Sequence, residues 1–417
     1  MRDEMMIASI QREPMPQKSA SLRPFAWAWL VYTILIILLA TCVWIPSGLY
    51  QKMDFRSMYA AGALARTHPS HLYDLSRQKQ IQDSLVERRD FAIPFGHLAY
   101  DALLYVPLSF LSYRNAYISV VLCNAILIAL CFLAARPEFS RTIPLWQPRP
   151  GLIFFTFMPT TIALAQGQDS MLLLLVVCLT WTLLERGHPF AAGLVLANML
   201  LKPHLAVLVA LFLAVRYGWR FVGGFVTGSA AVVAICLPFW LHGGFRAWFG
   251  VLSGLSLASG HSEAQEAAMG IYSWAMPNLR GALLLLLGQE LSSKVLFAVV
   301  CLASSILLVW GLVVARRLTA RNAFAFSMMV TALVSYNLEP HDLVILLLPM
   351  VLMEREGSRA LGWCRDLILG LPILLLIFAP STPPGAGFTL MTAPLLAAAI
   401  VLSRGALTRA ALETAPV

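Results

Sequence analysis

A small set of polar side chains in this chain combines the residue types that move a proton with those that bind a phosphate. A carboxylate can take a proton from a hydroxyl group, and lysine, arginine and histidine can hold an anionic phosphate. Together they suit a phosphorylated lipid donor and a hydroxyl acceptor. The set lies far apart in sequence and consists of Asp54, Gln168, Asp169, Lys202, Arg280, His341 and Asp342.

Each of these residues also has an ordinary structural explanation. Asp54 and Asp169 could cap the helices that follow them. Lys202 could be an interfacial lysine whose stem lies in the membrane. Arg280 could pair with a lipid phosphate. His341 could be a buried histidine at a helix start whose ring nitrogens are hydrogen-bonded within the protein. The chemical interpretation therefore depends on whether the fold brings these side chains to one place.

Composition defines the class of fold that must do this. The chain has 417 residues, of which 59% are hydrophobic and 12% charged, with a mean hydropathy of +0.75. Soluble domains carry roughly 25% charged residues. We therefore expect an all-α, polytopic membrane protein, and the net charge of +9 indicates basic cytoplasmic loops and not a nucleic-acid partner.

Apolar runs predict about twelve membrane spans. The first, residues 25–45, is long enough to cross a bilayer and resembles a signal anchor. The others lie near residues 115–135, 151–165, 170–184, 189–201, 204–215, 221–241, 294–315, 322–337, 343–353, 366–379 and 390–402.

The predicted orientation of the chain in the membrane depends on whether residues 95–111 cross it. This apolar segment is short and contains His97, Asp101 and Pro107. If it lies in the interface or is re-entrant, most arginines fall on the cytoplasmic side, as the positive-inside rule requires. The seven polar residues named at the start of this section then share the opposite side of the membrane. The predicted parts are a cytoplasmic tail (1–24), a transmembrane domain (25–403) with outer loops at 46–114 and 242–292, and a second cytoplasmic tail (404–417).

The first outer loop should be structured. Residues 57–66 and 75–89 both predict short amphipathic helices at the membrane surface. The seven cysteines lie outside the predicted outer loops, so we expect no disulfide framework. The sequence offers no compact cluster of ligands, and we expect no metal and no other cofactor.

The order of several motifs resembles glycosyltransferase family 87 over roughly residues 25 to 350. Its first outer loop is similar to Asp54-Phe55, Tyr59-x-x-Gly62 and Leu72-Tyr73-Asp74. The later series is more specific, since order and spacing both match: Gly167-Gln168, Glu185-Arg186-Gly187-His188-Pro189, Ala192-Gly193-Leu194 and Leu201-Lys202-Pro203. Two departures, Ile93-Pro94-Phe95 for an aromatic-Pro-Pro motif and Asp169 for a frequent Asn, leave the sugar and the acceptor open.

The resemblance implies a GT-C-like helical bundle in a bacterial plasma membrane, with its active site on the periplasmic side. It also implies inverting transfer of a mannose-like sugar from a polyprenyl-phosphate donor to a lipid or glycolipid acceptor. The catalytic aspartate falls on Asp54. We expect Lys202, Arg280 and His341 to bind the donor phosphate. The expected substrate-binding residues are Tyr59, Tyr73, Gln168, Asp169, Asn278 and Asp342.

Two alternatives remain open on the sequence. A lipid or solute transporter or flippase would also have many spans, but would have a passage that reaches both membrane faces, and often internal repeats. A catalytically inactive scaffold of the same fold would have the same helical bundle but no transfer activity. The enzyme interpretation requires Asp54, Lys202, Arg280 and His341 to line one cavity.

Overall fold

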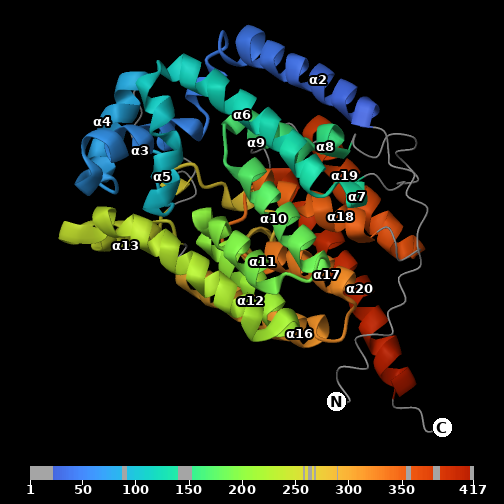
Figure 1. Cartoon of the computed structure of the whole chain (residues 1–417). Coiled ribbons are helices and arrows are strands. Elements are labelled where there is room, and N and C mark those ends of the chain that lie inside the picture. The colour runs from blue at the N-terminus through green and yellow to red at the C-terminus, as the bar shows by residue number, and fades with distance from the viewer. Residues whose placement is uncertain are drawn as a thin grey trace.

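The computed structural model describes residues 22–86, 92–139, 153–256, 259–261, 265–266, 269–288, 290–353, 358–378 and 386–413. These residues form helices and turns, and they contain no strand (Figure 1). Most of the predicted N-terminal tail, residues 1–21, lies outside them. The predicted tail after residue 404 is helical up to Glu413, because α20 (Thr392–Glu413) continues through it.

Four helices in the described part of the chain are long and apolar enough to cross a membrane: Phe25–Trp44, Tyr113–Ala134 (α6), Pro203–Trp240 (α12) and Ser293–Ala315 (α16). α16 exposes Leu302, Ile306 and Val309 by more than 60% each. Such a surface suits lipid, which is as apolar as these side chains. The chain is therefore a helical membrane protein, and the count of about twelve spans stays a prediction.

Shorter apolar helices account for most of the other predicted runs. They are Ser170–Glu185 (α10), Pro189–Leu201, Ala320–Val334 (α17), Pro340–Met353 and Phe388–Arg404. The predicted runs 204–215 and 221–241 form the two halves of α12, which is interrupted at Gly218. Its backbone angles, φ 68° and ψ −159°, lie in a region that glycine enters readily.

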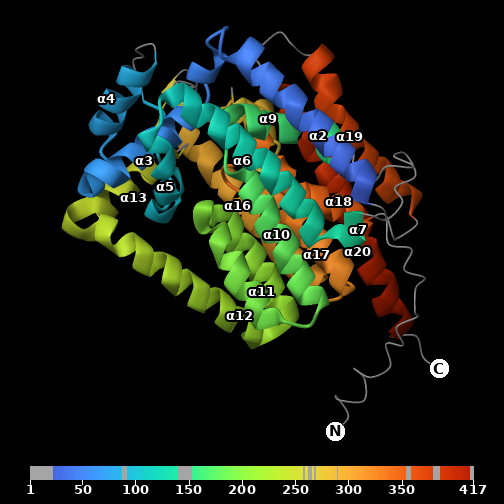
Figure 2. The same cartoon turned by 45° about the horizontal axis from the view of Figure 1, so that its top comes forward.

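The first outer loop folds as a compact group of helices. α3 (Phe55–Thr67), α4 (Leu75–Leu85) and α5 (Ala99–Tyr105) lie side by side in both views (Figures 1 and 2). α3 is buried along most of its length and is not the surface helix that amphipathicity predicted. α5 has seven residues, roughly 10 Å at 1.5 Å per residue. Since a bilayer core is about 30 Å thick, α5 alone is too short to cross it, and the interfacial or re-entrant position of residues 95–111 stays a prediction.

The most buried part of the described chain is formed by α17, the 3-10 helix η11 (Pro340–Leu346) and α18 (Leu347–Met353). α10 and α9 (Met158–Gln166) pack against η11. This packing brings the α9–α10 turn and the start of η11 together. The remaining long elements are α2 (Leu22–Leu39), α13 (Gly244–Gly254), α15 (Leu279–Leu287) and α19 (Arg359–Phe378).

Glycines allow α11 (Pro189–Leu196) to approach α12 closely. A Cβ atom on Gly193 would lie 2.2 Å from the Phe221 carbonyl oxygen, and one on Gly224 would lie 1.9 Å from that of Phe190. Small residues at such contacts are typical of membrane helix pairs, where van der Waals packing drives association. The pair positions Lys202, which lies between the two helices.

The contrast between Gly224 and its neighbour tests this packing. Gly224→Ala places a methyl group against the backbone of Phe190, and we expect a loss of about 1–3 kcal/mol in the free energy of unfolding. Gly223→Ala is the matched control, because its methyl group would meet only the Phe190 ring, at 3.8 Å. Thermal unfolding in detergent should show a lower midpoint for Gly224→Ala alone. Equal midpoints would contradict the close approach.

Candidate active site

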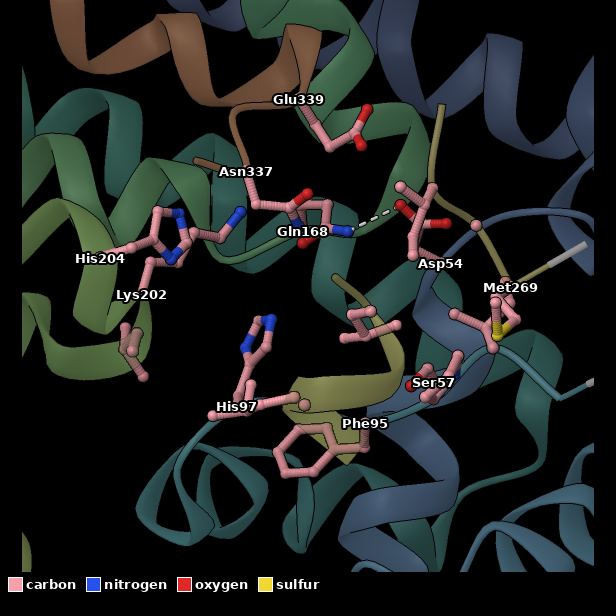
Figure 3. Close-up of a pocket in the computed structure, with 18 of the residues that line it drawn as sticks. Asp54, Ser57, Phe95, His97, Gln168, Lys202, His204, Met269, Asn337 and Glu339 are labelled. Carbon is pink, nitrogen blue, oxygen red and sulfur yellow. Dashed lines mark hydrogen bonds between the residues drawn. The ribbon is translucent and has the colours of Figure 1, made fainter. Parts of the chain in front are cut away.

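Side chains from distant turns line a cavity of about 390 Å³. Lys202 and His204 lie on one side of it and Asp54 on the other, with Gln168 between them (Figure 3). The polar lining comprises Asp54, Ser57, His97, Gln168, Lys202, His204, Asn337, Glu339, His341 and Asp342. The fold therefore gathers most of the predicted polar residues in one place.

Asp54 occupies the N-cap position of α3, but its side chain makes no capping hydrogen bond. Instead, its Oδ2 accepts a hydrogen bond of 2.8 Å from Nε2 of Gln168. Burial raises the pKa of Asp54, while this hydrogen bond and the charge of Lys202 oppose the rise. A carboxylate with a raised pKa is a better proton acceptor, so the position suits a general base.

The α9–α10 turn fixes the partner of Asp54. Gly167 has φ 64°, and a Cβ atom there would lie 2.9 Å from Cβ of Phe55. A side chain at this position would be strained and crowded. Asn124 Nδ2 donates a hydrogen bond of 3.0 Å to the Gln168 carbonyl. The turn is thereby held against the start of α3, which carries Asp54.

Lys202 is buried, with 5% of its surface exposed. Its Nζ lies 2.5 Å from Oδ1 of Asp342, 3.2 Å from Nε2 of His341 and 3.8 Å from Oδ1 of Asp169. Burial opposes the charge of Lys202, but Asp342 and Asp169 outweigh it and raise its pKa. Ser170 Oγ donates a further hydrogen bond to Asp342. The structure thus holds a positive charge at the cavity wall.

A second polar group lies beside this cluster. His97 Nδ1 is 2.5 Å from Oδ2 of Asp101 and 3.7 Å from Oδ2 of Asp169. The three side chains each place a ligand atom within 4.8 Å of the others. A nitrogen and two carboxylate oxygens at these separations could hold a divalent cation.

Glu339 adds a carboxyl group that sequence analysis did not assign to the site. Burial, together with the charges of Asp54 and Asp342, raises its pKa to about 8. At neutral pH it is mostly protonated and can donate a hydrogen bond into the cavity. Its carboxyl also accepts a hydrogen bond from the Tyr272 amide at 3.5 Å.

Five residues expected at the site do not line the cavity, and one of them, Asp169, lies beside the lining residues His97 and Lys202. The Tyr59 hydroxyl donates to the Leu111 carbonyl, and that of Tyr73 to the His97 carbonyl. Asn278 caps α15 through the Gly281 amide. These contacts give Tyr59, Tyr73 and Asn278 structural roles, and Arg280 likewise contacts other side chains of the fold.

Arg280 is almost fully buried behind the cavity. Its guanidinium donates to Asn337 Oδ1 at 3.1 Å and to Ser273 Oγ at 2.7 Å. It also pairs with Glu266 at 3.4 Å and lies over the Tyr336 ring. Arg280 therefore positions residues of the cavity wall instead of facing the cavity, so only Asp54, Lys202 and His341 of the four required residues line it.

Sequence analysis missed His97, His204 and Asn337 as lining residues. The signal was present for two of them. His97 and Asp101 are close in sequence and are residue types that pair, but we treated them only as interruptions of an apolar segment; in the structure His97 precedes α5 and contacts Asp101 from outside the helix. His204 follows Lys202 by two residues, so its place next to a predicted site residue was the signal for it.

These features define a helical membrane protein with a carboxylate opposite a cation in one cavity, an arrangement suited to group transfer. The family model of glycosyltransferase family 87 matches residues 101–339, more than half of the chain. The chain belongs to this family and is a glycosyltransferase. The match is narrower than the sequence resemblance and does not include Asp54, His341 or Asp342. No curated protein and no solved structure matches the chain.

The buried cluster around Lys202 predicts a large loss of stability when its cation is removed. Lys202→Met leaves Asp342 without its closest partner, and we expect a loss of about 3–5 kcal/mol. Lys202→Met combined with Asp342→Asn removes both charges and should recover part of this loss. Chemical unfolding in mixed micelles measures the difference. A single variant as stable as the wild type would contradict the ion pair.

Proposed function

We propose that this glycosyltransferase moves a mannose-like sugar from a polyprenyl-phosphate donor to a hydroxyl group of a lipid or glycolipid acceptor. The observation that carries the proposal is the position of Asp54 across one cavity from Lys202 and His341. A base and a phosphate site on opposite sides of a sugar are what direct displacement requires. The configuration at the anomeric carbon is then inverted.

Asp54 takes the proton from the acceptor hydroxyl as its oxygen attacks the anomeric carbon. The bond between that carbon and the phosphate oxygen breaks, and its electron pair leaves with the phosphate. Positioned base catalysis contributes about 10²–10⁴-fold to such a step. Because phosphate is a good leaving group, one carboxylate suffices where glycoside hydrolysis uses two.

Lys202 and His341 supply donors on the phosphate side. Lys202 carries its charge into the cavity, and Nδ1 of His341 has no hydrogen-bond partner among the described residues. Fixed donors in a dry cavity stabilise developing charge without reorganisation. Protonated Glu339 and Gln168 are the lining residues best suited to hold sugar hydroxyls.

The apolar part of the cavity supports a lipid-linked donor. Trp248, Leu252 and Leu255 come from α13 and the residue after it, and they face the cavity. Phe245 and Phe249 of the same helix are more than half exposed. An isoprenoid chain that enters from the outer leaflet would thus meet apolar side chains up to the phosphate site.

The proposal includes the side of the membrane on which the cavity lies. We place the cavity on the extracytoplasmic side of a bacterial plasma membrane, since this orientation leaves most arginines in cytoplasmic loops. A transporter is not favoured, because the chain belongs to a glycosyltransferase family. An inactive scaffold is not favoured either, because the cavity retains Asp54 and Lys202.

Loss of the base provides the direct test. Asp54→Asn should reduce transfer of labelled mannose from polyprenyl-phosphate-mannose by about 10²–10⁴-fold, because the acceptor proton has no base to receive it. Asp74→Asn is the matched control: Asp74 caps α4 in the same loop, and asparagine caps as well as aspartate. Transfer assays in membranes should separate them. Equal activity of a folded Asp54→Asn variant would remove Asp54 from this role.

The pH dependence of transfer tests the contact with Gln168. The Gln168 hydrogen bond stabilises the charged form of Asp54, so Gln168→Leu should raise the pKa of Asp54 further. The acid limb of the kcat/KM profile should then move to higher pH, with more of the wild-type rate retained at high pH than at low pH. An acid limb that stays in place or moves down would contradict this contact.

A further inference from the structure

His97, Asp101 and Asp169 form a group that the mechanism above does not use. His97 precedes α5, Asp101 lies in its first turn, and Asp169 is the residue before α10. The two elements are distant in sequence and meet beside the cavity. Asp101 is fully buried, and 5% of the Asp169 surface is exposed.

Three of the four carboxylate oxygens in this group have no hydrogen-bond partner among the described residues, although Asp169 lies within 3.8 Å of His97 and Lys202. Both oxygens of Asp169 and Oδ1 of Asp101 accept no hydrogen bond from the residues that the structure describes. Asp169 also stands at an N-cap position without capping the helix. Buried carboxylates are normally satisfied by hydrogen bonds, since leaving them bare costs free energy. The geometry indicates a ligand that these oxygens are arranged to meet.

The charged residues around the cavity indicate whether that ligand is a cation or an anion. Asp101, Asp169 and Asp342 lie close to a single lysine, Lys202, whose Nζ is already 2.5 Å from Asp342. An anionic phosphate would enter a region with more carboxylates than fixed cations. A divalent cation would reverse this balance where the phosphate must bind.

We propose that His97, Asp101 and Asp169 bind one divalent cation of the Mn²⁺ or Mg²⁺ class, and that the donor phosphate completes its coordination. Two carboxylates favour these hard ions, and one imidazole favours Mn²⁺ over Mg²⁺. The assignment of the phosphate as a ligand rests on the proposed function, whereas the ion-binding site does not. This proposal replaces the sequence expectation that no metal is bound.

The cation acts on the leaving group in the proposed transfer. When the bond between the anomeric carbon and the phosphate oxygen breaks, the electron pair moves to that oxygen and the ion stabilises its charge. Asp54 holds the acceptor proton on the other side. Gln168 and Asp169 are neighbours in one turn, so the base and the ion are positioned by the same segment.

Binding of Mn²⁺ to the purified full chain, after treatment with a chelator, tests the site. Electron paramagnetic resonance should show one bound ion per chain, and His97→Gln and Asp169→Asn should each weaken its binding by more than about tenfold. His71→Gln is the matched control: His71 lies 3.7 Å from Asp74 in the same loop, but both side chains are well exposed. It should bind Mn²⁺ as the wild type does.

Thermal unfolding provides a second readout of Mn²⁺ binding that does not depend on transfer activity. Mn²⁺ should raise the unfolding temperature of the wild type and of His71→Gln, but not that of His97→Gln. Absence of stoichiometric binding, or equal binding by the His97 and His71 variants, would overturn the proposal. Full transfer by the chelated wild type would reject the catalytic role of the ion and leave the proposed function intact. Absence of transfer with Mn²⁺ present would reject the proposed function, while the binding measurement still decides the site.

Discussion

The hydrogen bond from Gln168 to Asp54 is the contact on which the arrangement of the site depends. It joins the α9–α10 turn to the start of α3, two segments that the first outer loop and α6 separate in the chain. Gly167 makes it possible, since its positive φ and its lack of a side chain let the turn approach Phe55. The same turn directs Asp169 toward Lys202 and His97. One rigid segment thereby sets the spacing between the proposed base and the phosphate side.

The charged residues of the site are buried, so their positions depend on how the helices of the bundle pack. Lys202 lies between α11 and α12, and Asp342 lies in η11, which the most buried helices surround. A buried lysine retains its charge only where carboxylates outweigh the loss of hydration. The fold therefore holds its cation in place through packing that extends into the apolar core, and this differs from a site assembled on mobile surface loops.

The sequence predicted the class of fold and several residues that line the candidate site, for identifiable reasons. Hydropathy located the helical runs, and the cost of polar groups in a membrane made Asp54, Lys202 and His341 conspicuous. What it could not predict was the direction of each side chain. Arg280 has the right chemistry but points toward Glu266 and Asn337. The contact of His97 and Asp101 with Asp169 arises from tertiary packing between distant segments, which no local pattern encodes.

Gly270 lies next to Asp54 on the cavity wall. It has φ 82°, and a Cβ atom there would lie 3.7 Å from Oδ1 of Asp54. With Met269 and Ile271, it forms a wall of the cavity that carries none of the proposed chemical groups. Substitutions in this short stretch would reshape the space beside Asp54, the proposed base, without altering Lys202 or His341. The shape of the cavity next to Asp54 is therefore set by a stretch of chain that is separate from Lys202 and His341.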